Sequence, residues 1–305
     1  MTDKNIVFLG DKYLNYEDAK LPVRTHAFLY GTGVFEGIRA YYNQKQDKMY
    51  AFRMKEHFER MHNSCKIMFM DPKYSVEEYC NITKDLLIKN NYRTDAYIRP
   101  TVFKAAQKVG PSLLDNPDGV LIFTTALGSY FTKDEGLSVC VSSWDRLEDN
   151  SIPPRAKISG AYANTALIVT EAKLAGFDDA IVLSNDGHVA EGSAMNFFLV
   201  KGDTLITSRE TSNILVGVTR NTIIELAYEL GLKVVERDID RTELYIADEA
   251  FYCGTGAQVM PVTKIDHRPV GDGKTGKNTE KIQKLYFDLV RGELDIHRDW
   301  LTEIY

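Results

Sequence analysis

The most informative segment of this chain is Arg155-Ala-Lys157-Ile-Ser-Gly-Ala-Tyr162-Ala-Asn164, followed further along by Glu191-Gly-Ser-Ala-Met-Asn196-Phe-Phe. The first segment sets a lysine among small and apolar residues, shortly before a phenol. The second opens an apolar run with a carboxylate. A lysine that apolar neighbours shield from water loses its proton more readily, and the free amine is a nucleophile. The sequence therefore predicts a reactive amine at Lys157.

An amine, a phenol and a carboxylate in this order suit a Schiff-base enzyme that uses pyridoxal phosphate. We expect Lys157 to condense with the aldehyde of the cofactor and later to carry a proton between substrate and cofactor. We expect Glu191 to keep the pyridine nitrogen protonated, which makes the ring an electron sink. Tyr162 would bond the ring hydroxyl. The alternative for Lys157 alone is a solvated side chain at a helix start.

Separated motifs along the chain resemble those of the class IV aminotransferases in identity and order. They are the run from Lys157 to Asn196, Tyr30-Gly-Thr-Gly-Val-Phe-Glu-Gly-Ile-Arg39, Ala96-Tyr-Ile-Arg-Pro100, Gly217-Val-Thr-Arg220 and Gly254-Thr-Gly256. The resemblance covers nearly the whole chain and is greatest to the branched-chain amino acid group. It implies a pyridoxal 5'-phosphate enzyme of fold type IV. Such a protein is α+β, with a small α/β domain and a larger domain built on a curved, barrel-like sheet.

The pattern of apolar residues predicts how the chain divides into domains. Residues 1–124 alternate short apolar runs with amphipathic segments, as in an α/β unit. Small residues interrupt this pattern at 125–136, the expected interdomain loop, and residues 137–305 would form the larger, cofactor-binding domain. We expect strands at 6–9, 49–53, 96–103, 119–125 and 137–142. We expect helices at 55–68, 75–89, 161–175, 219–230 and 279–290, the second of them opened by the capping box Ser75-Val-Glu-Glu78.

A phosphate group needs backbone N–H donors, hydroxyls and a fixed cation, and a helix N-terminus supplies the donors. Gly217-Val218-Thr219 stands where a helix is predicted to begin, and the turn Gly254-Thr255-Gly256 adds a hydroxyl. The resemblance implies a phosphate cup made of Arg60, Val218, Thr219 and Thr255. The alternatives are that Thr219 only caps its helix and that Arg60 is a solvated helix residue.

Tyr97 and Arg99 lie two positions apart on a predicted strand, so their side chains share a face. A planar guanidinium can bind a carboxylate through two bonds, although an edge strand facing water is the alternative. By resemblance, Tyr97 holds the substrate α-carboxylate and Arg99 the distal carboxylate of glutamate. The resemblance also assigns substrate contacts to aromatic walls and to one turn: Tyr30, Phe35, Tyr130, Thr255, Gly256 and Ala257. Core packing is the alternative for the three aromatic residues, and for Phe35 in particular. At Leu127 some branched-chain members carry a tryptophan, so the sequence leaves open the width of the pocket and the preferred substrate side chain.

Composition narrows the class of protein. The 305 residues, 44% of them hydrophobic, can fill one large or two modest domains. A net charge of −6 argues against nucleic acid as the main partner. No apolar run approaches the roughly 20 residues that cross a bilayer, and no signal segment opens the sequence, so we expect a cytoplasmic protein without a membrane partner. The scattered cysteines lack metal-binding spacing, so we expect free thiols and no metal.

Other classes of function remain as alternatives. Gly31-Thr-Gly33-Val-Phe-Glu-Gly37 suggests an NAD-binding oxidoreductase, but its spacing is G-x-G-x-x-x-G and no clear strand precedes it. A non-catalytic binding protein would leave Lys157 idle. A D-amino acid aminotransferase or an aminodeoxychorismate lyase would use the same lysine, but Tyr97 and Arg99 favour the branched-chain group. We therefore expect transamination of Leu, Ile and Val with 2-oxoglutarate, giving 2-oxo acids and L-glutamate, by a homodimer or a higher homo-oligomer.

Overall fold

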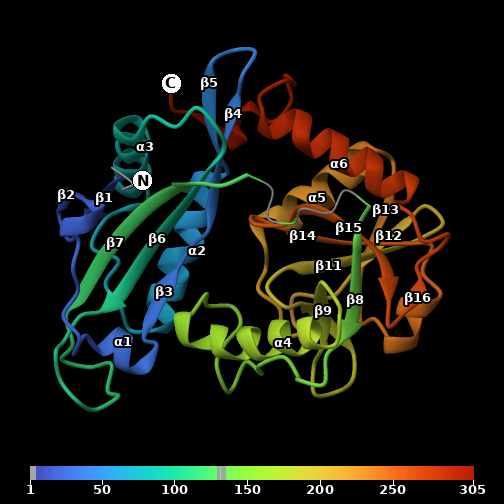
Figure 1. The fold of residues 1–305 in the computed structure, drawn as a ribbon, viewed down its shortest axis with the longest axis horizontal. Helices are drawn as coiled ribbons and strands as arrows, with labels where there is room; N and C mark the ends of the chain where they lie inside the picture. Colours follow the sequence, from blue (N-terminus) through green and yellow to red (C-terminus); the bar gives the residue numbers. More distant parts are fainter. Residues whose placement is uncertain (1–4, 129–130, 132–134) are drawn as a thin grey trace. The chain divides into compact units, whose positions relative to one another are not determined.

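The computed structural model describes residues 5–128, 131 and 135–305 of the chain. The chain forms two compact units, each with its own sheet (Figure 1). The first unit comprises Met1–Gly128, Ala156–Gly160 and Leu289–Tyr305, and the second comprises Ser129–Arg155 and Ala161–Asp288. The segment that carries Lys157 therefore belongs to the first unit.

The first unit is built on a sheet with the strand order β17-β5-β4-β6-β7-β1-β2, in which β3 also pairs with β6. Its described strand pairs are antiparallel, and consecutive strands form the hairpins β1–β2, β4–β5 and β6–β7. Helix α2 packs against α3 and β3, and α3 also packs against β1 and β7. The elements are β1 (Ile6–Leu9), β2 (Lys12–Asn15), η1 (Tyr16–Asp18), α1 (His26–Tyr30), β3 (Gly33–Phe35), β4 (Ile38–Asn43), β5 (Lys48–Phe52), α2 (Met54–Ile67), α3 (Val76–Asn90), β6 (Ala96–Lys104), β7 (Asp118–Ala126), η4 (Arg298–Trp300) and β17 (Leu301–Glu303).

Most of these elements follow the sequence prediction closely. Helix α3 begins where the capping box predicts, because Ser75 Oγ accepts from the Glu78 N–H while the Glu78 carboxylate accepts from the Ser75 N–H. The prediction missed α1, β3, β4 and β17. Strand β4 is buried almost throughout, so it lacks the alternation of polar and apolar residues by which a strand is recognised.

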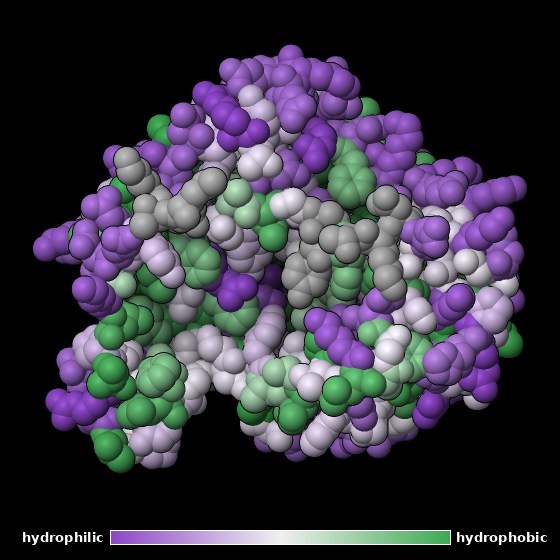
Figure 2. All heavy atoms as spheres, viewed as in Figure 1, coloured by the Kyte–Doolittle hydropathy of each residue, from purple (hydrophilic) through white to green (hydrophobic). Residues whose placement is uncertain are grey.

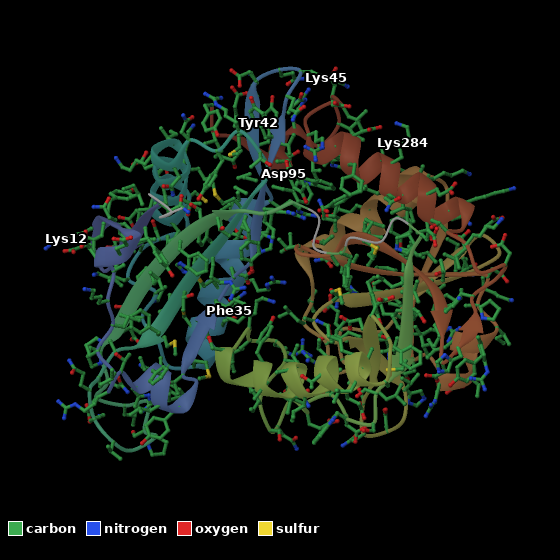
Figure 3. All side chains as sticks on the ribbon, in the orientation of Figure 1. Lys12, Phe35, Tyr42, Lys45, Asp95 and Lys284 are labelled. Carbon is green, nitrogen blue, oxygen red and sulfur yellow. The ribbon has the colours of Figure 1, made fainter. Side chains whose placement is uncertain are left out.

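The end of the chain returns to the first unit. Strand β17 pairs with β5, and the Arg291 guanidinium lies 3.0 Å from the Asp95 carboxylate. Asp95 also accepts from the backbone N–H of Tyr42 on β4, at 2.9 Å (Figure 3). The two compact units therefore differ from the predicted domains, because the first unit also contains Ala156–Gly160 and Leu289–Tyr305. Pairing between strands that are distant in the chain leaves no local pattern in the sequence. The predicted domain boundaries at residues 124 and 137 stay a prediction.

The second unit is built on a sheet that curls into a half-barrel, with the order β10-β9-β8-β15-β14-β11-β12-β13 and with β16 beside β15. In Figure 1, α5 and α6 lie along one side of these strands and α4 along the other. The elements are β8 (Leu137–Val141), η2 (Ser159–Ala161), α4 (Tyr162–Leu174), β9 (Asp179–Leu183), β10 (Val189–Gly192), β11 (Asn196–Lys201), β12 (Thr204–Thr207), α5 (Val218–Glu229), β13 (Lys233–Glu236), η3 (Arg241–Tyr245), β14 (Glu249–Gly254), β15 (Gln258–Ile265), β16 (Arg268–Pro269) and α6 (Lys277–Val290).

Helices α4 and α5 are crossover connections of this second sheet. Helix α4 lies between β8 and β9 in the chain, and α5 lies between β12 and β13, and both strand pairs are parallel. Parallel neighbours require such a crossover. In α/β units, ligands usually bind where strands end and crossover helices begin. Tyr162 and Val218 are the first residues of the two helices, so the fold sets predicted site residues at such positions.

Two further findings concern membranes and metals. The helices in the described residues are all too short or too polar to cross a membrane. In the same part of the chain, no group of three or more His, Cys, Asp or Glu side chains is arranged to hold a metal ion. The cysteines are free, and Cys65, Cys140 and Cys253 are buried.

Candidate active site

The Lys157 backbone is held between a strand and a helix of the first unit. Its carbonyl accepts from the Phe35 N–H of β3 at 3.0 Å, and its N–H donates to Ser64 Oγ of α2 at 3.2 Å. The Lys157 Nζ lies 5.2 Å from the centre of the Phe35 ring. The amine is therefore set beside an aromatic face from a backbone that is fixed on both sides.

Arg99 approaches the same aromatic ring from β6. Its guanidinium carbon lies 4.3 Å from the centre of the Phe35 ring. Its Nε and a terminal nitrogen donate to the Tyr97 hydroxyl at 3.1 and 2.7 Å, so the two side chains share one face of the strand as predicted. Gly37 makes room for this pair, since a Cβ there would lie 2.5 Å from the Tyr97 hydroxyl. Phe35 thus lies beside both Lys157 and Arg99.

Arg60 is bound by a buried carboxylate that the sequence reasoning did not single out. Glu36 accepts from Nε and a terminal nitrogen of Arg60, both at 2.7 Å, and it is fully buried. The Arg60 side chain is only 15% exposed, so it is not a solvated helix residue. A glutamate between Phe35 and Gly37 in an apolar run was the available signal, because a buried carboxylate needs a cation.

The second unit holds Glu191 by both carboxylate oxygens. The Arg146 guanidinium lies 2.6 Å from one oxygen, and Asn196 Nδ2 donates to the other at 3.0 Å. The side chain of Glu191 is only 4% exposed. An adjacent guanidinium favours the ionised carboxylate. Each oxygen of a carboxylate can accept more than one bond, so Glu191 retains acceptor capacity for a protonated ring nitrogen.

Asn196 connects this carboxylate to the start of α5. Its Nδ2 also donates to the Leu215 carbonyl at 2.9 Å. Gly217 is required beside it, because a Cβ on Gly217 would overlap Asn196 Oδ1. Gly217 is the N-cap of α5, and within the described part of the chain no side chain caps the helix. Thr219 is therefore not the cap, and the first turn presents N–H donors that suit an anion.

The turn from Thr255 to Ala257 follows β14 in the same unit. Asn196 pairs with Cys253 across β11 and β14, so the turn starts two residues beyond this pair. Gln258 closes it with a φ of 61°, in the left-handed region. Thr255 and Gly256 are half-buried and Ala257 is buried. Glu191, the start of α5 and the strand that leads into this turn thus meet at one asparagine, Asn196, which the sequence reasoning mentioned without a role.

Other residues predicted for the substrate pocket make contacts elsewhere or lie outside the description. The Tyr30 ring packs against His26, with centroids 4.8 Å apart, and its hydroxyl accepts from the Gly110 N–H at 2.8 Å. The carbonyl of Leu127 accepts from the Arg39 guanidinium at 2.7 Å. Tyr130 lies outside the described residues.

The reversed order of elements excludes a dinucleotide-binding turn at Gly31-Thr-Gly33. A dinucleotide fingerprint joins a strand to a helix. Here α1 (His26–Tyr30) precedes the glycines and β3 (Gly33–Phe35) follows.

The donor groups of the site residues described above fit pyridoxal phosphate. The first unit offers an amine for an aldehyde, and the second unit offers a helix start with hydroxyls for a phosphate and a buried carboxylate for a pyridinium.

Comparison with known proteins gives matches along the whole chain. Residues 33–265 match the family model described as amino-transferase class IV. A probable branched-chain-amino-acid aminotransferase of Aquifex aeolicus (strain VF5) is 43% identical over 302 residues, covering 99% of this chain and 97% of the relative. The structure of a branched-chain amino acid aminotransferase from Thermobaculum terrenum in its PLP form has a TM-score of 0.96 and 36% identity, covering 100% of both chains. The structure of a branched-chain aminotransferase from Thermoproteus uzoniensis with norvaline has a TM-score of 0.95 and 36% identity, covering 99% of both chains.

Proposed function

The chain belongs to the class IV aminotransferases, and we propose that it transfers the amino group of leucine, isoleucine or valine to 2-oxoglutarate, forming 2-oxo acids and L-glutamate. Full-length relatives and solved structures with branched-chain names support this choice within the family. Pyridoxal 5'-phosphate, when bound, supplies an aldehyde for the amino group and a ring that withdraws electrons from the substrate Cα.

The observation that carries the proposal is the set of contacts made by Asn196. It joins Glu191, a carboxylate suited to a pyridinium, to the start of α5, which is suited to a phosphate. In this assignment the N–H groups of Val218 and Thr219 and the Thr255 hydroxyl hold the phosphate. Glu191 keeps the ring nitrogen protonated. The remaining cofactor contacts are the Tyr162 hydroxyl on the ring oxygen and the Arg60 cation on the phosphate.

Lys157 is the catalytic residue of the proposed reaction. Its amine would hold the cofactor aldehyde in the resting enzyme, and during transfer of the amino group the same amine would carry a proton between the substrate Cα and the cofactor. Hydrogen bonds from Phe35 and to Ser64 fix the Lys157 backbone, so the amine reaches the proton from a constant position.

The substrate pocket must admit an aliphatic side chain and a carboxylate in alternation. We assign the α-carboxylate to Tyr97 and the distal carboxylate of glutamate to Arg99, whose planar fork suits bidentate binding. Arg99 is held by Tyr97 and by the Phe35 ring, so it is positioned before glutamate binds. The further pocket contacts would come from aromatic walls and from the turn after β14: Tyr30, Phe35, Tyr130, Thr255, Gly256 and Ala257.

We also infer a homodimer in the cytoplasm. The first unit exposes a patch of apolar side chains on and near α1 and on the loop after β6, visible at the lower left of Figure 2. Phe28 is 79% and Val109 88% exposed. Apolar patches of this kind usually mark an interface, and a second copy is the most common partner. Free thiols suit a reducing compartment. Light scattering at two concentrations tests the dimer.

A half-reaction screen tests the proposed activity. The holoenzyme is mixed with single L- and D-amino acids, without any oxo acid, and the conversion of the cofactor is followed by absorbance. We expect conversion by L-leucine, L-isoleucine, L-valine and L-glutamate. Conversion by D-amino acids alone would assign the chain to the D-specific group of the family.

A further inference from the structure

A buried three-residue cluster in the first unit contains a carboxylate to which the proposed mechanism gives no role. Glu36 accepts two bonds from Arg60, and its second oxygen also accepts from His57 Nδ1 at 2.8 Å. His57 and Arg60 are three positions apart on α2, so they project from one face of the helix. Glu36 lies between β3 and β4, with its N–H bonded to the Pro100 carbonyl at 3.0 Å. The carboxylate is thus held by its backbone and by two side chains.

The charge state of this Arg60–Glu36–His57 cluster follows from its contacts. Burial alone would raise the pKa of the Glu36 carboxyl, but Arg60 and His57 hold that pKa well below its usual range. Glu36 is therefore an anion that only accepts hydrogen bonds, so the proton between it and His57 belongs to Nδ1. Burial lowers the pKa of His57, and the charges of Arg60 and Lys157 lower it further against the opposing effect of Glu36. The cluster contains one anion, one cation and one neutral imidazole.

Stability alone does not explain such a cluster. A buried ion pair is often no more stabilising than apolar side chains of the same volume. Moreover, the Glu36 charge opposes the attraction of Arg60 for a phosphate. What the geometry does provide is orientation, because two parallel bonds fix the plane of a guanidinium at the end of a flexible side chain. Glu36 accepts two of the five N–H donors that a guanidinium carries.

We propose that Glu36 is a positioning residue that orients Arg60 for the phosphate of the cofactor, and that His57 in turn fixes Glu36. The inference rests on the proposed function, which gives Arg60 its phosphate. A role through charge and a role through orientation predict opposite changes in phosphate binding when Glu36 is replaced. If Glu36 acts mainly through charge, its removal strengthens phosphate binding; if it acts through orientation, its removal weakens it.

The test compares two aldehydes on the apoenzyme. Pyridoxal 5'-phosphate and pyridoxal differ only in the phosphate, and the absorbance change on binding to the protein gives a Kd for each. For Glu36→Gln we expect the preference for the phosphorylated aldehyde to fall at least about tenfold, the effect of one hydrogen bond to a charged group. The Kd for pyridoxal is expected to stay as in the wild type, because pyridoxal does not need Arg60.

Matched variants separate orientation from damage to the fold. Asp118→Asn breaks another buried ion pair of the same unit, to Lys104 at 3.1 Å, and should leave the preference unchanged. His57→Asn keeps an N–H donor near Nδ1 and should retain the preference, whereas His57→Leu should lower it in the same direction as Glu36→Gln. If Glu36→Gln does not fold, comparison of His57→Asn with His57→Leu provides the test.

The outcomes are distinct. A Glu36→Gln protein that binds pyridoxal 5'-phosphate as tightly as the wild type, or more tightly, overturns the positioning role. An equal loss for both aldehydes also overturns it, because Glu36 then only supports the fold. Arg60→Met reports on the proposed function itself: if this variant keeps the full preference for the phosphate, Arg60 does not bind the phosphate at all.

Discussion

At the scale of single residues, one aromatic ring lies beside two cations of the first unit. Phe35 is 6% exposed, and its ring centre lies 4.3 Å from the Arg99 guanidinium carbon and 5.2 Å from Lys157 Nζ. Each such contact stabilises by about 0.5–2 kcal/mol, more when water is excluded. The sequence left a choice between a core aromatic and a pocket wall. The ring is buried like a core aromatic, and it also lies beside two cations like a pocket wall. In addition, the Phe35 N–H bonds to the Lys157 carbonyl.

Removing the Lys157 amine should abolish catalysis. For Lys157→Ala we expect turnover to fall at least about 10²–10⁴-fold, the usual contribution of a proton-transfer group alone, and further because the nucleophile is also lost. Borohydride reduction of the wild-type holoenzyme, followed by peptide mapping, should find the cofactor on Lys157. Lys173→Ala, which removes an exposed lysine of α4, is the control and should stay active. A reduced adduct on any other lysine contradicts the assignment.

Removing the Arg99 guanidinium should change the ratio of kcat/KM for glutamate to kcat/KM for leucine. Glutamate brings a second carboxylate and leucine does not, and a charge-assisted contact contributes roughly 1.5–3 kcal/mol. For Arg99→Leu we expect kcat/KM for glutamate to fall at least about tenfold relative to leucine. Tyr97→Phe is the companion variant and should weaken both substrates, since both carry the α-carboxylate. Equal losses for leucine and glutamate in a folded Arg99→Leu protein would refute the role of Arg99.

At the scale of elements, two helices begin in different ways. Helix α3 closes its own first turn through the reciprocal bonds of Ser75 and Glu78. Helix α5 has Gly217 as its N-cap, without a capping side chain among the described residues. Gly217 has an ordinary φ of −75°, so glycine is needed there for space beside Asn196 and not for backbone freedom. An uncapped start beside an immobilised asparagine is a helix end prepared for an external anion.

Adding a methyl group at Gly217 should disturb this helix start. A Cβ there would overlap Asn196 Oδ1, so Asn196 must move and Glu191 loses the hydrogen bond from Asn196. For Gly217→Ala we expect a loss of about 1–3 kcal/mol in unfolding free energy, typical of overpacking, and weaker cofactor binding. Gly254→Ala is the stability control, because a Cβ there meets Met195 only at ordinary distances from 3.7 Å. Thermal unfolding measures the stability, and titration with the cofactor measures its Kd. If both are unchanged in Gly217→Ala, the close contact with Asn196 is contradicted.

At the scale of the whole molecule, the chain leaves and re-enters its first unit. It leaves after Gly128, returns for Ala156–Gly160, and returns again at Leu289. The segment with Lys157 is therefore anchored by β3 and α2, far away in the sequence. The same unit contains the buried Glu36 and His57, whose protonation links its stability to pH.

The stability of the protein should fall on acidification in two steps. The pKa of His57 and the pKa of Glu36 are both lower in the folded chain, so their contributions are complete above the unfolded pKa values and are lost as the pH falls toward the folded ones. The loss should start near about pH 6.5 through His57 and deepen below about pH 4.3 through Glu36. Denaturant unfolding at a series of pH values measures it. In His57→Asn, compared in the same cofactor state, the first step should disappear; an unchanged slope between these pH values would exclude His57 as its source.

Local patterns in the sequence were sufficient to predict the chemistry and most of the elements. The family motifs, the capping box at Ser75 and the shared face of Tyr97 and Arg99 each involve residues close together in the chain, so they survive in a one-dimensional string. They were enough to predict the family, the cofactor and helices α2 to α6 within a few residues of their observed bounds. The roles of individual site residues remain predictions that the variants above test.

Which groups touch became clear only from the three-dimensional packing of the chain. Glu36 on Arg60, Arg146 on Glu191 and Asn196 beside Gly217 are contacts between segments that the sequence gives no reason to pair. The return of β17 to β5 and the anchoring of Lys157 by Ser64 are of the same kind. Such contacts follow from the burial of charges and strand edges, which must find partners wherever the packed chain brings them. Periodicity describes one segment at a time, so it contains no information about those partners.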